Sequence, residues 1–331
     1  MKNRILQTDL FISTGCFTVF LLSLLILTSC ATIPREQRLN NAVIVHTIEG
    51  DAADSLAGQY YQNPSEQWRI LEFNETAAIT PDQNIVIPLK PFRMGGVTAG
   101  GYQTVPVLAY HQFSSGKSAP ARTQTRSAFE SQLEYLVDHN YSVISLDRFL
   151  AFLRLEEQLP EKSILLIFDS TDQSIYDIGF PLLQRYRYPA VVFVTPTVVG
   201  QKNTLSWDQI NRMAEYGIEI QCRIPDSAYH FSSKETFYRY FQNLKNAVEQ
   251  ASGLINTKTG RQCRLFLYPP GDHRSLLVHL LQKQGFQGAV IDQKGGNPFF
   301  VDPYALHVTR VTGNPDGKNF ETLLQVFQRF D

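Results

Sequence analysis

The sequence predicts an α/β fold for the larger part of the chain, in which parallel strands alternate with helices. Seven short apolar runs recur after residue 104, and the segments between them are long enough for crossover helices. Several of these runs are continuously apolar, as expected for parallel strands that are covered on both faces. The runs span residues 105–109, 163–168, 190–194, 218–222, 265–268, 289–291 and 305–308. This pattern alone does not choose between a barrel and an open sheet.

Length and composition indicate a globular protein with two folded units. A chain of 331 residues exceeds the usual size of one domain, so a leader, one small unit and one large unit form a natural division. The hydrophobic fraction of 43% and the aromatic fraction of 12% suit a buried core and argue against extended disorder. The formal net charge of -1 lacks the basic excess of a nucleic-acid-binding surface. We therefore expect no nucleic-acid partner.

The first 29 residues are predicted to be a secretory leader. Lys2 and Arg4 precede an apolar run over residues 10–27, which is typical of such leaders. The sequence Leu-Thr-Ser at 27–29 stands directly before Cys30 and resembles the bacterial lipoprotein signal. The resemblance implies that Cys30 is lipidated, and two or more acyl chains anchor a protein stably. The alternative is an uncleaved transmembrane helix of about 18 apolar residues.

These features predict a cell-envelope protein whose bulk lies outside the cytoplasm and is held at a membrane by lipid. Ala31 follows Cys30. In the lipoproteins of diderm bacteria, an Asp at that position favours retention in the inner membrane. The resemblance therefore favours the outer membrane and periplasm.

Two cysteines, Cys222 and Cys263, remain in the large unit. Cys222 is near the end of its predicted strand, and Cys263 is near the start of the next. Along neighbouring parallel strands this offset exceeds the Cα separation of about 7 Å that a disulfide can bridge. We expect two buried free thiols.

Residues 42–88 predict a small βααβ unit. A strand-like run at 43–48 ends in Glu-Gly-Asp, and Asp51 is a candidate helix cap. Helical spacing of apolar residues follows over 56–60 and 68–73, with a break at Asn63-Pro64. The apolar run 85–88 ends in proline and suits a closing strand of a two-stranded sheet.

This small unit resembles the LysM glycan-binding module. The likeness rests on the Gly50-Asp51 pair, on Asn74, and on Gln83-x-Ile-x-Ile-Pro. It implies recognition of N-acetylglucosamine polysaccharides such as peptidoglycan, with Gly50, Asp51 and Asn74 at the substrate groove. The alternative is that these residues only shape turns. Residues 89–104 are Gly-rich and are predicted to be a flexible linker.

Residues 105–331 resemble the NodB-type polysaccharide deacetylases, carbohydrate esterase family 4. The likeness rests on the order and spacing of several segments, and it implies a (β/α)7-like distorted barrel and hydrolysis of N-acetyl groups on sugars. The segments are Pro106-Val-Leu-Ala-Tyr-His111, Phe129-Glu-x-Gln-Leu-x-Tyr-Leu136, Tyr188-Pro-Ala-Val-Val-Phe-Val194, Leu205-Ser-Trp207, Gly217-Ile-Glu-Ile220 and Tyr268-Pro-Pro-Gly-Asp272.

In that family an Asp and two His hold a divalent metal, usually zinc, which activates a water. A second Asp acts as base and a His protonates the leaving amine. The first signature, T-F-D-D-G, reads Ile-Phe-Asp-Ser-Thr here, so Asp169 keeps the base position and Ser170 replaces a ligand. The second, H-[ST]-x-x-H, has Arg223 and Ser227 in place of both histidines. All three ligands are replaced, which implies a catalytically inactive barrel without a metal cofactor.

The same resemblance suggests further site residues. Tyr268 and Pro269 are expected at the substrate groove, and His307 is a candidate general acid in the last strand. Leu267 stands where many members carry an Arg that fixes the base. With no metal to compete, Asp169 is predicted to pair with Arg223.

Three functions remain open. The first is binding of peptidoglycan or another N-acetylglucosamine polysaccharide by an inactive barrel and the small unit. The second is an active N-deacetylase with a relocated zinc site at Asp172, His230 and His273, although Asp172 also suits a helix cap and both histidines suit surface loops. The third is a scaffold in an envelope assembly. The sequence identifies no protein partner and no oligomeric state.

Overall fold

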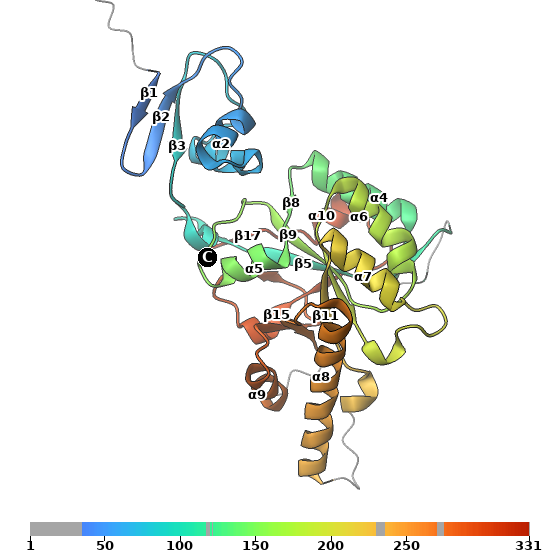
Figure 1. Ribbon diagram of the computed structural model, residues 1–331. Coiled ribbons are helices and arrows are strands. Elements are labelled where there is room, and N and C mark those ends of the chain that lie inside the picture. Colours follow the sequence, from blue (N-terminus) through green and yellow to red (C-terminus); the bar gives the residue numbers. More distant parts are fainter. Residues whose placement is uncertain (1–34, 117–119, 121, 230–235, 270–274, 331) are drawn as a thin grey trace, which may run out of the picture. The chain divides into compact units, whose positions relative to one another are not determined.

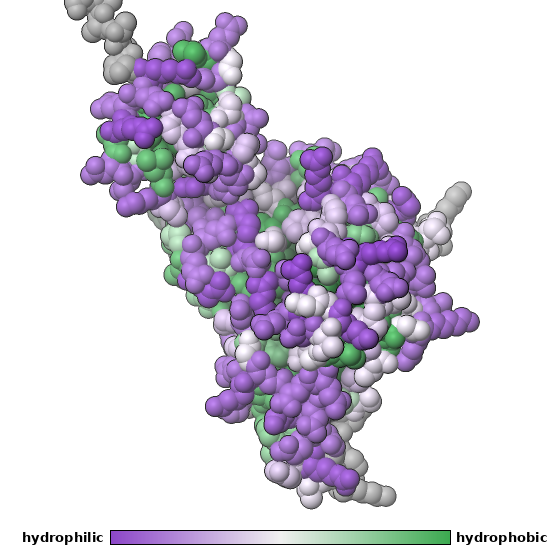
Figure 2. Space-filling model, in the orientation of Figure 1, coloured by the Kyte–Doolittle hydropathy of each residue, from purple (hydrophilic) through white to green (hydrophobic). Residues whose placement is uncertain are grey.

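The computed structural model describes residues 35–116, 120, 122–229, 236–269 and 275–330. The predicted leader and the candidate lipidation site Cys30 lie outside these residues. The chain divides into two compact units, Met1–Lys90 and Pro91–Asp331 (Figure 1). Figure 2 shows that hydrophilic side chains cover most of the visible face, with small hydrophobic areas scattered between them. No helix in the described ranges is both long and apolar enough to span a bilayer.

The small unit is a three-stranded antiparallel sheet with two helices packed against it. The order β2, α2, α3, β3 is the predicted one, and an additional strand, β1, pairs with β2. Strand β1 has no apolar residue and joins the sheet through its backbone, so no hydrophobic pattern predicts it. The elements are β1 (Glu36–Arg38), β2 (Ala42–His46), α2 (Ala53–Tyr61), α3 (Gln67–Phe73) and β3 (Asn84–Pro88). The core contains Val43, Val45, Leu56, Ala57, Ile70, Ile85 and Ile87.

Asn74 ties the end of α3 to β3. Its Nδ2 donates hydrogen bonds to the carbonyl oxygens of Ile70 at 2.8 Å and Val86 at 2.7 Å, and its Oδ1 accepts from the Val86 amide at 2.9 Å. In the loop after β2, Asp51 Oδ2 accepts from the Ile48 amide at 2.9 Å. The side chains of Asn74 and Asp51 thus hold the backbone of this unit in place.

Replacing Asn74 with alanine is expected to lower the free energy of unfolding of the small unit by about 2–3 kcal/mol, because two carbonyls and one amide lose their partner. Asn84→Ala is the matched control, since the Asn84 side chain is exposed and, among the described residues, bonds to His46 alone. It should change the free energy by less than about 0.5 kcal/mol. Urea titration of Trp68 fluorescence in a Trp207→Phe background measures both, and equal effects would contradict the assigned role.

The large unit is a nearly closed barrel of parallel strands, which confirms the predicted (β/α)7-like fold. The strand order is β5, β9, β10, β11, β12, β13, β15, and β16 returns to β5. Because β15 and β16 are consecutive pieces of the last strand, they close the ring. The bounds are β5 (Val105–Tyr110), β9 (Ser163–Phe168), β10 (Val191–Val194), β11 (Glu219–Cys222), β12 (Leu265–Leu267), β13 (Gly288–Ile291), β15 (Leu306–His307) and β16 (Thr309–Arg310).

Most helices pack against the outside of this barrel, whereas α5 packs against its interior side chains (Figure 1). Thr125, Ser206 and Thr236 cap the amino ends of α4, α7 and α8, where each side chain accepts from a backbone amide. Helix α7 ends at Gly217, whose φ of 105° suits glycine. The helices are α4 (Arg126–Asp138), α5 (Leu146–Leu153), α6 (Phe180–Tyr186), α7 (Trp207–Tyr216), α8 (Phe237–Thr259), α9 (Ser275–Lys283) and α10 (Gly317–Glu321).

Residues 91–104, expected to be a flexible linker, belong to the large unit instead. Strand β4 (Gly101–Gln103) pairs with β17 (Phe327–Arg329), and Gln103 Nε2 donates to the Pro160 carbonyl at 2.5 Å. The glycines serve close packing: Gly96 has a φ of 61°, and a Cβ there would lie 2.2 Å from the Cβ of Gln103. The glycine content of this segment therefore reflects close packing and not a flexible linker.

Cys222 and Cys263 are both free, as predicted. Cys222 is buried, but Cys263 is only half-buried. The strand register places Cys222 opposite Phe266, three residues beyond Cys263. The two thiols are nevertheless close enough to interact: burial, and after it the Cys263 thiol, raise the pKa of the Cys222 thiol. The predicted offset between the two residues therefore does not separate their side chains.

Candidate functional site

Strand alternation brings charged side chains together at the carboxyl end of the barrel. On β5, Leu108 and Tyr110 pack toward the helices, whereas the alternate residues Val107 and Ala109 fill the barrel interior. The next interior position on β5 is His111. On several other strands too, the interior-facing position near or just beyond the carboxyl end carries a polar side chain. We call these side chains the rim cluster. Its members are His111, Asp169, Arg223, Asp292 and Arg310.

Asp169 is the centre of the rim cluster, and its side chain is 2% exposed. Its Oδ1 lies 2.7 Å from Nδ1 of His111, and its Oδ2 forms an ion pair with Nη1 of Arg310. Because a carboxylate only accepts hydrogen bonds, Nδ1 of His111 carries the proton of a neutral ring. Arg310 also reaches Asp292, with Nε 2.8 Å from Oδ1. Both oxygens of the buried carboxylate thus have a donor.

The predicted pairing of Asp169 with Arg223 is wrong. Arg223 donates from Nη1 to the backbone carbonyl of Asp169 at 3.1 Å, and its Nη2 lies 2.9 Å from Oδ1 of Asp226. Arg310 takes the carboxylate because the β16 register places it beside Ala109. It thereby supplies the guanidinium that is missing at Leu267, from a different strand.

The residues at the ligand positions do not fit a divalent metal. Ser170 is half-buried and its Oγ accepts from the Asp172 amide at 3.1 Å, while Ser227 is exposed in the short 3-10 helix Asp226–Tyr229. The third position holds Arg223, and a guanidinium has no lone pair to offer. In the ranges that the structure describes, no three His, Cys, Asp or Glu side chains form a group able to hold a metal ion.

The alternative zinc site is only partly within the described residues, because His230 and His273 lie outside them. Asp172 is engaged on both oxygens: Oδ2 accepts from Gln112 Nε2 at 2.9 Å, and Oδ1 accepts from the Ser174 amide at 2.9 Å. The carboxylate therefore sits at the start of the helical turn that leads into α6, which agrees with the capping role. Its local geometry gives no support for a relocated metal.

The other predicted site residues lie apart from Asp169. His307 and Arg310 are three positions apart on the last strand, so they point to opposite faces, and a Cβ on Gly295 would lie 2.6 Å from Nδ1 of His307. Tyr268 is buried among residues that face the helices. Pro269 is half-buried beyond the end of β12.

Burial and neighbouring arginines lower the pKa of His111 to about 4. The guanidinium groups of Arg122, Arg310 and Arg223 oppose protonation, and Asp172 favours it. The carboxylate at 2.7 Å also favours the protonated ring, but Arg310 already neutralises that carboxylate. Burial and the guanidinium charges therefore prevail. Burial likewise lowers the pKa of Arg310 to about 10, with Arg122 adding to the shift.

This shift predicts a loss of stability in acid. The unfolded chain protonates His111 near pH 6.5, whereas the folded protein keeps it neutral down to about pH 4, so lowering the pH through this window favours unfolding. We expect His111→Asn to reduce the slope of unfolding free energy against pH between 6.5 and 4. Urea titrations at several pH values measure that slope, and an identical slope in the variant would contradict the shift.

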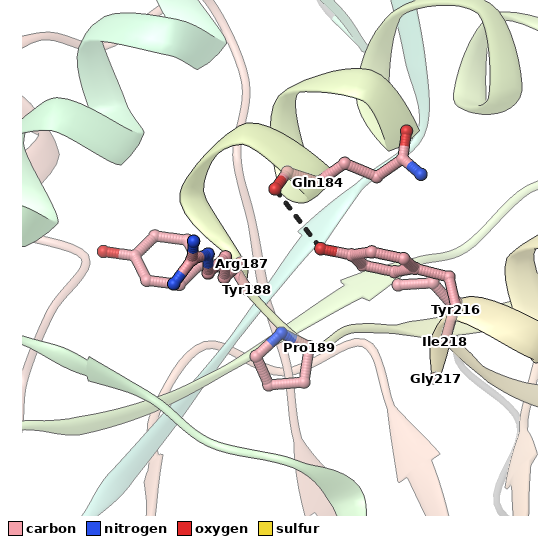
Figure 3. A pocket seen from close by; sticks show the side chains of 7 residues that line it. All are labelled: Gln184, Arg187, Tyr188, Pro189, Tyr216, Gly217 and Ile218. Carbon is pink, nitrogen blue, oxygen red and sulfur yellow. Dashed lines mark hydrogen bonds between the residues drawn. The ribbon is translucent and has the colours of Figure 1, made fainter. Parts of the chain in front are cut away.

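A surface pocket of about 590 Å³ lies at the other end of the barrel (Figure 3). It is formed where β10 and β11 begin, whereas Asp169 follows the carboxyl end of β9. The Tyr216 hydroxyl donates to the backbone carbonyl of Gln184 at 3.2 Å and fixes one wall. The lining residues are Gln184, Arg187, Tyr188, Pro189, Tyr216, Gly217 and Ile218. This pocket is separate from the rim cluster.

Residues 156–289 match the family model described as polysaccharide deacetylase. The chain is 25% identical over 221 residues to the putative polysaccharide deacetylase YxkH of Bacillus subtilis, covering 67% of this chain and 76% of that protein. It is 26% identical over 227 residues to poly-beta-1,6-N-acetyl-D-glucosamine N-deacetylase of Staphylococcus epidermidis, covering 66% of this chain and 76% of that protein.

Two solved structures share the barrel. The deacetylase PplD of Streptococcus pyogenes superposes with a TM-score of 0.60 at 17% identity, covering 68% of this chain and 99% of that one. IcaB from Ammonifex degensii superposes with a TM-score of 0.58 at 24% identity, covering 64% of this chain and 93% of that one. At these identities the likeness shows the fold alone.

Proposed function

We propose that this chain is a lipid-anchored envelope protein that binds N-acetylglucosamine polysaccharide without deacetylating it, through a barrel similar to the polysaccharide deacetylases. The main support for this proposal is the identity of the side chains at the three metal-ligand positions. Two hydroxyls and one guanidinium stand where a metal would need an anionic oxygen and two imidazoles. Function depends on the site rather than on the fold, so relatives named as deacetylases do not bring their activity with them.

The contacts of Arg223 support the absence of a metal. Its side chain is 19% exposed, and both terminal nitrogens are engaged with Asp169 and Asp226. A guanidinium remains charged at any pH that the protein meets. It therefore opposes a divalent cation at this position both by charge and by occupying the space.

The small unit supports the glycan-binding half of the proposal. It has its own core and the βααβ order of the LysM-like pattern, with the Gly50-Asp51 turn after β2. The leader and Cys30 supply the membrane anchor in this account. Peptidoglycan is the polymer that an envelope protein with such a unit would meet.

A sedimentation assay with insoluble peptidoglycan tests this binding. The full-length chain in detergent should sediment with the polymer, and a variant that lacks residues 42–88 should stay mostly in the supernatant. The deletion removes one unit that has a separate core, so circular dichroism should show the barrel unchanged. Failure of the full-length chain to sediment would refute the proposal.

Deacetylation is the second candidate, because a relative is named as an N-deacetylase and Asp169 keeps the base position. It requires metal bound by groups other than Ser170, Arg223 and Ser227. Zinc content and acetate release separate the two candidates.

A further inference from the structure

We infer that the carboxyl end of this barrel binds an anionic sugar, whose carboxylate is held between Arg122 and Arg223. The inference rests on the proposed function, since it names the class of polysaccharide that the barrel would take. The small unit, by contrast, is expected to recognise neutral N-acetylglucosamine.

Arg122 lies next to the rim cluster. Strand β6 (Gln112–Ser114) pairs in parallel with β7 (Thr123–Thr125), with Gln112 opposite Thr123. One position earlier on both strands, Arg122 stands beside His111. Arg122 is exposed, and the described part of the chain offers it no hydrogen bond or ion pair.

In the described ranges, three of the four acidic side chains near this position form ion pairs. Asp169 is bound by His111 and Arg310, which also holds Asp292. Asp226 pairs with Arg223, and Asp172 accepts hydrogen bonds from Gln112 and Ser174. Within the same ranges, the guanidinium of Arg122 has no carboxylate partner.

Burial is the largest cause that lowers the pKa of His111; the guanidinium groups of Arg122, Arg310 and Arg223 lower it further, and Asp172 raises it. Three guanidinium groups thus act on this end of the barrel, and their charges favour an anion over a cation.

A carboxylate suits Arg122 because a guanidinium binds it through paired N–H···O bonds. Arg122 contributes an unengaged fork at the surface. Arg223 is fixed by its contacts with Asp169 and Asp226, so its position is set before a ligand arrives. Neutral sugars can accept hydrogen bonds from these groups but carry no charge that complements them.

Isothermal titration of the full-length chain in detergent tests the inference with two probes of equal length. One is a hyaluronan tetrasaccharide, which alternates glucuronate with N-acetylglucosamine, and the other is neutral chitotetraose. We expect hyaluronan to bind at least tenfold more tightly at low salt, and the difference to shrink in 0.5 M NaCl because salt screens the charges. Arg122→Gln should weaken hyaluronan binding about tenfold. Arg329→Gln removes the same charge from exposed strand β17 and should have no effect.

An unchanged hyaluronan affinity in Arg122→Gln would overturn the inference. If chitotetraose still binds in that case, glycan binding by the small unit stands and only the anionic preference falls. If neither probe binds, the proposed function falls as well.

Discussion

Replacing Arg310 with methionine is expected to lower the free energy of unfolding of the large unit by about 3–5 kcal/mol. The variant leaves the carboxylate of Asp169, 2% exposed, without its cationic partner. An unpaired buried charge is far less stable than a paired one, because the desolvation penalty stays while the attraction is lost. Urea titration of Trp207 fluorescence in a Trp68→Phe background measures the loss.

The double variant Asp169→Asn, Arg310→Met is the matched control. Removing both charges should recover part of the stability that the single change loses, because no buried charge is left alone. A loss below about 1 kcal/mol in Arg310→Met, or simple additivity of the two single changes, would contradict the pairing.

Restoring all three family ligands is expected to create a zinc site, whereas restoring one is not. The variant Ser170→Asp, Arg223→His, Ser227→His supplies the carboxylate and two imidazoles that zinc prefers, and should retain about one zinc per chain after dialysis. Ser170→Asp alone should retain none, because the guanidinium of Arg223 remains. Zinc is measured by elemental analysis, and circular dichroism checks the fold.

Stoichiometric zinc in Ser170→Asp alone would show that Arg223 does not exclude the metal. The variant Ser170→Asp, Ser227→His gives a further comparison, since it differs from the triple variant only at Arg223. It should stay empty, because it keeps the guanidinium and lacks the second imidazole.

The barrel could be predicted because its strands carry their own signal. Strand β9 is buried on both faces, so its consecutive residues are nearly all apolar and the run can be recognised in the sequence. Closure of the ring of strands could not be predicted from the apolar runs. The last strand splits into β15 and β16, and only family resemblance distinguished a barrel from an open sheet.

Strands that are held mainly by backbone hydrogen bonds were not predicted from the sequence. Strand β1 has the sequence Glu-Gln-Arg, and β4 is a glycine-rich piece that pairs with β17 from the far end of the chain. Neither shows an apolar pattern, because each is fixed by backbone hydrogen bonds, β1 to the neighbouring strand β2 and β4 to the distant β17. The glycines at 95 and 96 suggested a flexible linker, but they are needed because the backbone packs closely against Phe299 and Gln103.

The sequence predicted which family residues are replaced at the candidate site, but it did not predict which side chains contact Asp169. Asp169, Ser170, Arg223 and Ser227 follow from local motifs. The partners of Asp169, His111 and Arg310, lie 58 and 141 positions away from it in the sequence. A usable signal existed: counting alternate positions beyond the apolar run of β5 places His111 on the interior face.

Zinc content and acetate release, measured together on the wild-type chain, test the central claim most directly. The full-length protein should be purified in zinc-containing buffer, dialysed, and incubated with N-acetylglucosamine oligomers. We predict far less than one zinc per chain and no acetate above the protein-free control. One zinc per chain, with acetate release that a chelator abolishes, would contradict the account.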